Sequence, residues 1–490
     1  MLSWVVPPPE RIWYNAPPAA NGCLSNFFIP ARVSMNALEK RSVTALASVY
    51  AMRMLGLFMV MPVFVLLGSD LQGATPALIG LAIGAYGLSQ ALLQIPFGLL
   101  SDRVGRKRMI YIGLVLFAAG SLLAASTDSI YVVIAGRILQ GAGAIASVLM
   151  ALLSDLTREE ERTKAMAMVG ISIGLSFSVS LVVGPLLGSL WGLSGIFYAT
   201  AAMAMVALFI VARVVPTPHA HRISADTHPA REMVGRVLRD GRLLRLDFGI
   251  FILHFALTAL FLVFPTMLQD QLGLASVSHW WFYLTVMVTS FFAMVPFIII
   301  GEKKRVMKPV LCGAIALLSL ATAALTGVEK SLWLAWGVLF FFFTAFNLLE
   351  ASLPSLISKE APAASKGTAM GVYSTSQFFG AFLGGALGGY LLQSAGLEGV
   401  LWLMADGLAA WFLVALTMPA PNYTTSFVVE LEQVLPAGFD EIDETLRRLP
   451  GVQDVVIVED AATAYLKVDR QHFHEDQLAH FEFVRQGKGS

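Results

Sequence analysis

Apolar segments of bilayer length recur along most of the chain, and they limit the folds open to it more than any other feature. A helix needs about 20 mainly apolar residues to cross the hydrocarbon core of a membrane. Only 13% of the residues are charged, against about 25% in soluble globular proteins. We therefore expect an all-α membrane protein with twelve spans. The predicted spans are 43–67, 77–100, 109–126, 130–153, 164–187, 194–214, 246–268, 278–300, 306–326, 331–354, 366–392 and 396–418.

Basic residues gather in alternate loops between these spans. One set of loops carries clusters such as 103–108 and 303–308, whereas the other set carries Asp70, Asp128 and Asp270. Cytoplasmic loops of membrane proteins are enriched in Lys and Arg. We therefore expect the basic loops and both chain termini to face the cytoplasm. The protein is predicted to be a multi-pass protein of the bacterial inner membrane.

A long, polar and basic linker, 215–245, divides the spans into two sets of six. The two sets share a repeat, because 95–103 (IPFGLLSDR) aligns with 295–303 (VPFIIIGEK) at a shift of 200 residues. The acidic and basic residues of the motif are kept in the second copy, whereas its glycines are lost. Parallel repeats of this kind build one class of membrane transporters. We therefore expect two six-helix halves, 43–214 and 246–418.

The two ends of the chain differ from this pattern. Residues 1–42 are predicted to be a cytoplasmic tail, and two readings of 1–34 stay open. This proline-containing stretch is either a disordered tail or a segment outside the native protein, with translation starting at Met35. Beyond Pro421 the pattern changes to strand, helix, strand, strand, helix. Residues 424–490 are therefore predicted to be a small α+β, ferredoxin-like domain in the cytoplasm.

The link between the second and third spans carries the pattern Gly98-x-x-x-Asp102-Arg103-x-Gly105-Arg106-Lys107. It resembles the loop signature of the major facilitator superfamily. That resemblance implies a twelve-helix facilitator fold. It also implies a cytoplasmic charge cluster that holds the outward-facing state closed and breaks when the protein switches.

The residues of this latch are expected to come from three spans. Asp155, at the end of span four, comes to the same face as the loop, so an Asp–Arg–Asp cluster can bridge spans two, three and four in one state only. The alternative is ordinary positive charge on the cytoplasmic side. The candidate latch residues are Gly98, Asp102, Arg103, Gly105, Arg106 and Asp155.

Twelve facilitator spans followed by a small soluble domain resemble the YajR-type transporters within that superfamily. The resemblance covers roughly 36–485 and includes Lys366-Gly-Thr-Ala-Met-Gly-Val-Tyr-Ser-Thr-Ser-Gln377. It implies a secondary active transporter that works by alternating access, with proton-coupled efflux (antiport) of small amphipathic compounds. Transport of a sugar, a metabolite or an organic anion is the alternative within the class. A membrane sensor that signals through the C-terminal domain is the alternative outside it.

Ionisable residues inside spans are costly and usually functional. Arg53 and Arg137 are the candidates in the first half, and Arg137 lies in Gly136-Arg-Ile-Leu-Gln-Gly-Ala-Gly143, which resembles a family motif linked to proton coupling. Arg53 could receive an anionic group, pair with an acid of the second half, or act structurally. Because spans one to six carry no interior acid, the acids must come from the second half. The candidates there are His254, Glu350 and Asp406.

Span five carries Gly184, Pro185 and Gly188, with Gly170 and Gly174 upstream. This arrangement resembles a motif associated with exporters, and small residues let helices approach closely in membranes. Generic helix packing is the other interpretation.

Several classes of function find no support in the sequence. Cys23 and Cys312 are the two cysteines, so no cysteine metal cluster is expected, and no catalytic or nucleotide-binding motif appears. We expect a non-enzyme without a cofactor. Its expected partners are a small-molecule substrate, protons and the bilayer, with no nucleic acid and a monomeric state. The identity of the substrate, the coupling ion and the direction of transport stay open.

Overall fold

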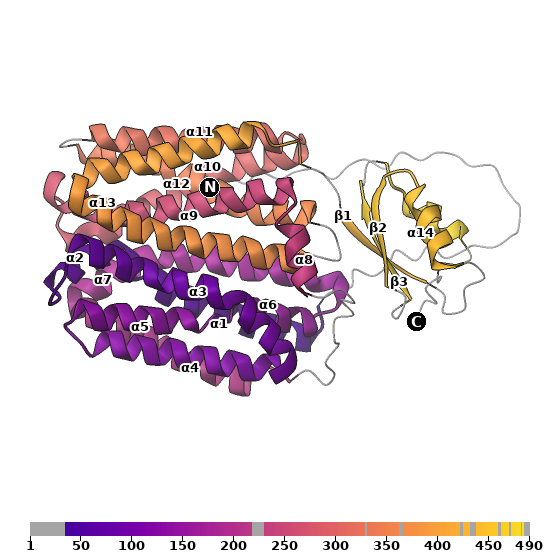
Figure 1. Cartoon of the computed structure of the whole chain (residues 1–490), viewed down its shortest axis with the longest axis horizontal. Helices are drawn as coiled ribbons and strands as arrows, with labels where there is room; N and C mark the ends of the chain where they lie inside the picture. Colours follow the sequence, from indigo (N-terminus) through magenta and orange to yellow (C-terminus); the bar gives the residue numbers. More distant parts are fainter. Residues whose placement is uncertain are drawn as a thin grey trace, which may run out of the picture.

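The computed structural model shows a long helical body with a small sheet domain at one end (Figure 1). It describes residues 35–217, 230–328, 331–361, 366–421, 425–431, 438–458, 462–469, 472–481 and 483–484. The predicted tail 1–34 and residues 218–229 of the predicted linker lie outside this part of the chain.

Thirteen α-helices make up the body and its linker. Short single turns connect some of them, and α8 belongs to the linker between the halves. The helices are α1 (Ala37–Phe58), α2 (Met61–Leu67), α3 (Pro76–Val104), α4 (Arg106–Ala125), α5 (Ile130–Ala142), α6 (Ala146–Asp155), α7 (Glu159–Arg213), α8 (Ala230–Val237), α9 (Gly241–Thr266), α10 (His279–Lys303), α11 (Met307–Ala324), α12 (Leu332–Glu360) and α13 (Lys366–Leu416).

The predicted twelve-span fold is confirmed. Ten helical segments of the described chain are long and apolar enough to cross a membrane, and two of them are 50 residues long. Each long segment is two helices joined at a glycine with positive φ, Gly192 (φ 66°) in α7 and Gly396 (φ 71°) in α13. A residue with a side chain rarely adopts this backbone conformation. The glycines therefore allow the chain to reverse direction and start another span with almost no loop.

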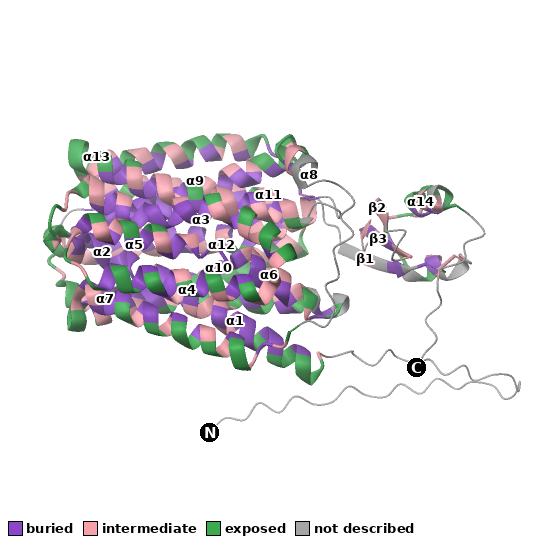
Figure 2. Ribbon diagram, turned by 60° about the horizontal axis from the view of Figure 1, so that its bottom comes forward, coloured by how far each residue is buried: buried purple, intermediate pink, exposed green. Residues whose placement is uncertain are grey.

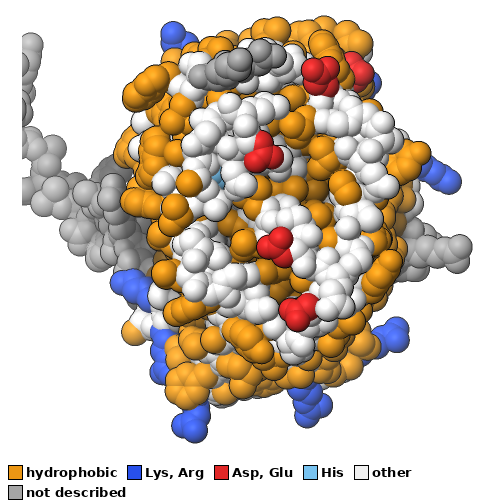
Figure 3. Space-filling model, turned by 90° about the vertical axis from the view of Figure 1, so that its left-hand side faces the viewer, with side chains coloured by type: hydrophobic (Ala, Val, Ile, Leu, Met, Phe, Trp, Pro, Cys, Tyr) orange, Lys and Arg blue, Asp and Glu red, His pale blue; other side chains and the backbone are white. Residues whose placement is uncertain are grey.

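The two ends of the body differ in charge. We call the end with Asp70, Asp128 and Asp270 the acidic end, and Figure 3 shows acidic side chains on this face. We call the opposite end, which has the α3–α4 turn, the α10–α11 turn and the sheet domain, the basic end. The segregation of charge by loop that the sequence predicts is therefore present along the long axis of the body.

Buried residues gather along the centre of the body (Figure 2), where the first half (α1–α7) meets the second half (α9–α13). Helix α3 lies against α13, α2 against α9 and α7 against α10. The α3–α13 contact joins backbone to backbone at the acidic end, because a Cβ added at Gly84 would lie 2.6 Å from the Phe382 carbonyl oxygen. Nearer the basic end the two backbones lie farther apart, since a Cβ at Gly371 would meet only the Ile95 side chain, at 3.9 Å.

The sheet domain has three antiparallel strands in the order β1-β3-β2, followed along one edge by an isolated bridge between Leu431 and Val484. This is the strand arrangement expected of a ferredoxin-like domain. Its core contains Leu446 of α14 and Leu466 of β3. The elements are β1 (Thr425–Glu430), α14 (Phe439–Arg447), β2 (Val452–Val458) and β3 (Thr463–Val468).

One predicted element differs in the structure. The segment 474–484, predicted as a last helix, forms only a 3-10 turn over Glu475–His480. Beyond this turn the Val484 amide donates to the Phe481 carbonyl, and Val484 forms a bridge with Leu431. Pairing with the sheet edge therefore replaces continuation of the helix.

We predict that Gly84→Ala weakens the packing of the two halves. The new methyl group would press on the α13 backbone, and overpacking of this kind costs about 1–3 kcal/mol. The expected result is a lower unfolding midpoint in detergent and faster labelling of cysteines placed at the acidic end. Gly337→Ala is the matched control, because a Cβ at Gly337 meets nothing within 4 Å. Equal midpoints for the two variants would contradict the prediction.

Candidate functional site

The loop signature forms an ionic cluster at the basic end. Arg106 Nη1 lies 2.5 Å from the Asp102 carboxylate, and its Nε lies 3.4 Å from the Asp155 carboxylate. Arg106 also donates a hydrogen bond of 2.6 Å to the Ser101 hydroxyl. One guanidinium therefore joins the ends of α3 and α6 from the first turn of α4. This is the three-span cluster that the sequence predicts, and all its members belong to the first half.

The other signature residues shape the turn around this cluster. Gly105 ends α3 and begins α4 at φ 104°, a conformation that strongly favours glycine. Gly98 faces α6, where a Cβ would lie 3.3 Å from the Ser147 hydroxyl. Arg103 is exposed and has no ion-pair partner within the described part of the chain. The structure therefore brings together Asp102, Arg106 and Asp155 but leaves Arg103 outside their cluster.

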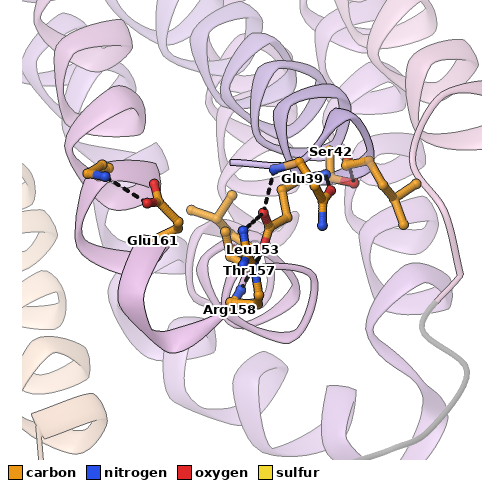
Figure 4. Close-up of polar contacts among 9 residues, drawn as sticks. Glu39, Ser42, Leu153, Thr157, Arg158 and Glu161 are labelled. Atoms are coloured by element: carbon orange, nitrogen blue, oxygen red, sulfur yellow. Dashed lines mark hydrogen bonds and ion pairs between the residues drawn. The ribbon is translucent and has the colours of Figure 1, made fainter. Parts of the chain in front are cut away.

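A second ion pair at the basic end was missed by the sequence analysis. Glu39, in the first turn of α1, accepts hydrogen bonds from Arg158 Nε (2.8 Å), Arg158 Nη2 (2.9 Å) and the Arg158 backbone amide (3.0 Å) (Figure 4). The Glu39 side chain is only 5% exposed, against 43% for Arg158. This bidentate pair ties the start of the first span to the loop between α6 and α7.

The sequence predicts the local contacts of Glu39 at the start of α1 but not its pairing with Arg158. Asn36 and Glu39 form a capping box, in which the Asn36 side chain accepts from the Glu39 amide and the Glu39 carboxylate accepts from the Asn36 amide. A capping residue followed three positions later by Glu predicts this helix start. The distant partner, 119 residues away in sequence, has no such local pattern.

Arg53 lies in the interior of the first half, with an exposed fraction of 1%. Its Nη2 donates to the Tyr86 hydroxyl and to the Gln90 side chain, and Gln90 in turn donates to Gln94. Its Nε and Nη1 groups have no hydrogen-bond partner among the described residues. Burying a cation without a counter-ion is costly, so Arg53 is poised to receive an acceptor. Pairing with an acid of the second half, one of the alternatives for Arg53, does not occur among the described residues.

Arg137 is equally buried and lies next to the same tyrosine. Its guanidinium carbon lies 5.1 Å from the centre of the Tyr86 ring, which allows a cation–π contact. It also donates to the carbonyl oxygens of Ala82 and Ile83 and to the Gln140 side chain. Arg137 therefore bonds to backbone carbonyls and an amide side chain, and no carboxylate contacts it among the described residues. Tyr86 links the two arginines into one network.

The second half carries the acids of the interior. Glu350 on α12 accepts from the Gln377 side chain at 3.3 Å, and its carboxylate lies 3.8 Å from His254 Nδ1. Gln377 also lies 2.8 Å from His254 Nε2. Asp247, two turns before His254 on α9, is buried and has no hydrogen-bond partner for either oxygen among the described residues. Helices α9, α12 and α13 therefore meet at a cluster of titratable groups.

Asp406 lies apart from this cluster. It is exposed on the second helix of α13, on the outer surface of the body, and so does not join His254 and Glu350. Of the span-five residues, Gly184 packs against the Met59 carbonyl and Gly188 lies against Leu67. Gly170 and Gly174 meet nothing within 4 Å, so only the part of α7 that contains Pro185 uses its glycines for close packing.

The interior is thus divided by charge. The first half contributes two buried arginines and amide or phenol groups, whereas the second half contributes Asp247, His254 and Glu350. Within the described residues, none of these interior groups forms an ion pair with a residue of the other half. Such an arrangement can bind an anionic group at the arginines and exchange a proton at Glu350, whose side chain is 33% exposed. No group of three potential metal ligands occurs among the described residues.

The sequence and structure resemble those of known transport proteins. The sequence profile described as Major Facilitator Superfamily matches residues 46–385. The inner membrane transport protein YajR of Escherichia coli (strain K12) is 46% identical over 432 residues, which cover 88% of this chain and 94% of that protein. The multidrug resistance protein MdtH of Klebsiella pneumoniae (strain 342) is 27% identical, with 74% and 90% coverage. The fold resembles that of a D-xylose–proton symporter, with a TM-score of 0.62 and 15% identity over 78% of this chain and 99% of that one.

We predict that Glu39→Gln destabilises the protein by about 1–2 kcal/mol. The change weakens charge-assisted hydrogen bonds to Arg158, and each such bond is worth about 1.5–3 kcal/mol before its exposure to solvent is allowed for. The unfolding midpoint in detergent is the measurement. Glu161→Gln is the control, because Glu161 is similarly buried but pairs with Lys164 within its own helix. A larger loss for the control than for Glu39→Gln would contradict this reading.

Proposed function

The chain belongs to the major facilitator superfamily and is a multi-pass membrane transport protein, and on this premise we propose that it is a secondary active transporter that exports small amphipathic compounds in exchange for protons. The observation that carries the proposal is the division of buried charge between the halves. Two arginines lie on one side, and the titratable side chains of Glu350 and His254, both in contact with the Gln377 amide, lie on the other. Alternating access gives such a site contact with each side of the membrane in turn.

The orientation of the protein in the membrane is the first part of the proposal. The turns at the basic end carry Arg and Lys clusters, so this end faces the cytoplasm under the positive-inside rule, in the inner membrane. Both termini then lie in the cytoplasm. The acidic end, where α3 and α13 touch through their backbones, is the periplasmic side. The divergence of these helices towards the basic end favours an inward-facing state.

The cluster of Asp102, Arg106 and Asp155 acts as the latch in this scheme. Its contacts lie within the first half, so it does not hold the halves together in the present state. Asp102 keeps 52% of its side chain exposed and is therefore available to a group of the second half when the basic end closes. In the outward-facing state this added partner stabilises the closed basic end, because a partly buried charge loses much when its partner is removed.

Glu350 is the proposed proton carrier. Its carboxylate has neighbours that can adapt to either protonation state, because Gln377 can turn its amide and His254 can change tautomer. Its partial exposure gives protons a route to it, whereas His254 is buried. Export of amphipathic compounds is supported by the printed name of the MdtH relative, a multidrug resistance protein.

An organic-anion substrate is the second candidate. The observation that favours it is the pair of unpartnered N–H groups on the buried Arg53 guanidinium. A carboxylate or sulfonate of the substrate would accept both and offset the buried charge. Under this proposal, anionic compounds compete with one another for transport. Arg53→Lys is expected to remove the preference of the protein for anions, because an ammonium lacks the planar, two-point geometry of a guanidinium.

Glu350→Gln is expected to abolish substrate-dependent proton movement while keeping substrate binding. The amide keeps the size and most hydrogen bonds of the acid but cannot carry a proton. The measurement uses purified protein in liposomes with an imposed pH gradient and a trapped pH dye, against a panel of amphipathic cations and anions. Asp406→Asn is the matched control, because Asp406 is an exposed acid on the outer surface. Unchanged proton movement with Glu350→Gln would overturn its role.

Deletion of 424–490 separates a transporter from a sensor. A transporter is expected to retain measurable substrate flux in the same liposomes, because the charged site lies wholly within the helical body. A sensor is expected to keep ligand binding but show no flux in either form. A full-length protein that binds its ligand but moves none of it across the membrane would contradict the transporter proposal.

A further inference from the structure

The α10–α11 turn is the second-half copy of the loop signature, and it departs from the first copy at several positions, among them Val306 in place of Arg106. At the shift of 200 residues, Gly105 aligns with Arg305. Both residues have positive φ, 104° for Gly105 and 55° for Arg305. Arg305 is one of only two non-glycine residues with positive φ in the described chain. Such a backbone is strained for a residue with a side chain, so the arginine needs a compensating interaction.

The compensating interaction comes from the sheet domain. Arg305 Nη2 and Nη1 donate to the two carboxylate oxygens of Asp469, at 2.6 and 3.1 Å. Such a bidentate pair, with two hydrogen bonds between one guanidinium and one carboxylate, is the strong form of an ion pair. The side chains are 31% and 15% exposed, so the pair is partly shielded from water. Asp469 directly follows the central strand β3, which fixes the position of its carboxylate.

A second contact from the same strand closes a ring. Lys467 on β3 donates to the backbone carbonyls of Lys359 and Ala361, at the end of α12. A cation suits this position, because the end of a helix carries partial negative charge. The Lys359 ammonium in turn lies 2.7 Å from Glu302, at the end of α10. The ends of α10 and α12, the turn with Arg305, and strand β3 are therefore joined in one cycle of polar contacts.

The first half needs no such addition. Its loop arginine, Arg106, finds Asp155 on α6. At the same shift of 200 residues the second half has Ser355 in place of Asp155, so its own helices offer no acid there. Among the described residues, the hydrogen bonds and ion pairs between sheet domain and body all go to the second half. Asp469 thus gives Arg305 a carboxylate partner from outside the half, as Asp155 gives Arg106 one from within it.

We propose that the sheet domain is a working part of the second half: it docks on the α10–α11 turn through Asp469 and Lys467 and supplies the acid that this half lacks. The docked domain moves with α10, α11 and α12 as one body during transport. Its partner surface is the turn 302–306 together with the end of α12. The effect on transport rests on the proposed function, whereas the docking does not.

Docking is measured on the full-length protein from the distribution of distances between two attached spin labels. Cys23 and Cys312 are first replaced by Ser, and spin labels are placed at Lys303→Cys at the end of α10 and Arg448→Cys directly after α14, both exposed positions. The expected result is a narrow distance distribution for the parent and a broad one for Asp469→Asn, with the undocked fraction raised at least about tenfold. Lys304→Gln is the matched control on the same turn and should leave the distribution narrow.

The charge swap Arg305→Asp with Asp469→Arg tests the pair itself. Asp tolerates positive φ, so the swap is expected to restore a narrow distribution that either single change broadens. Arg305→Gly relieves the backbone and removes the guanidinium, so it should undock the domain while the unfolding midpoint stays within the range of the control. A narrow distribution in Asp469→Asn, or a swap that fails to restore docking, would overturn the proposal.

The flux assay separates this inference from the proposed function. If the domain is a working part of the second half, the undocked variants lose about threefold or more in substrate-dependent flux, and the charge swap recovers it. A broad distance distribution with unchanged flux would show that docking has no role in transport, and it would overturn the proposed effect of the domain on flux. Absence of flux in the parent would count against the proposed function, while the distance measurement would still decide the docking.

Discussion

The backbone contact between α3 and α13 is the interaction on which the rest of the helical body depends. In a membrane, lipid tails are as apolar as leucine, so helices gain little from hiding apolar side chains from one another. Close approach must come from small residues. Gly80, Gly84 and Gly87 on α3 meet the α13 backbone, while Gly380 and Gly384 on the other side of α13 meet α9. One helix therefore packs on two neighbours through its glycines and fixes where the halves touch.

This packing decides where charge can lie. The tight contact runs from Gly80 to Gly87 on α3, and Arg137 donates to the Ala82 and Ile83 carbonyls of the same stretch. The interior ionisable groups must therefore lie beside the contact. Each half then satisfies its own buried groups differently: Arg53 and Arg137 share Tyr86, whereas Glu350 and His254 share Gln377. Among the described residues, Arg53 and Arg137 have no acidic partner, and Glu350 has only His254 as an ion-pair partner. The imbalance is a reason for the halves, or a ligand between them, to interact.

The sequence predicts the architecture well because span length, loop charge and the 200-residue repeat are local or periodic signals. The glycine-containing turn at Gly105 is also a local signal, whereas the cluster of Asp102, Arg106 and Asp155 was expected from the family resemblance of the loop and from the position of Asp155 at the end of span four. The pair of Glu39 with Arg158 was not, because only the capping box at Asn36 leaves a local trace. Asp406 shows another limit: hydropathy places it within a span but does not tell the outer surface from the interior. The docking of Asp469 on Arg305 joins segments 164 residues apart, and no periodicity connects them.

The glycine contact near one end of α3 also has a mechanical meaning. From Gly84 to the end of α3 at Val104 the helix runs about 30 Å, at a rise of 1.5 Å per residue. With the contact as the fulcrum, a tilt of roughly ten degrees displaces the far end by about 5 Å, the length of one helical turn. Little sliding is needed where the backbones touch. Under the proposed alternating access, a small rotation of one half about this contact therefore opens the basic end by about the length of one helical turn.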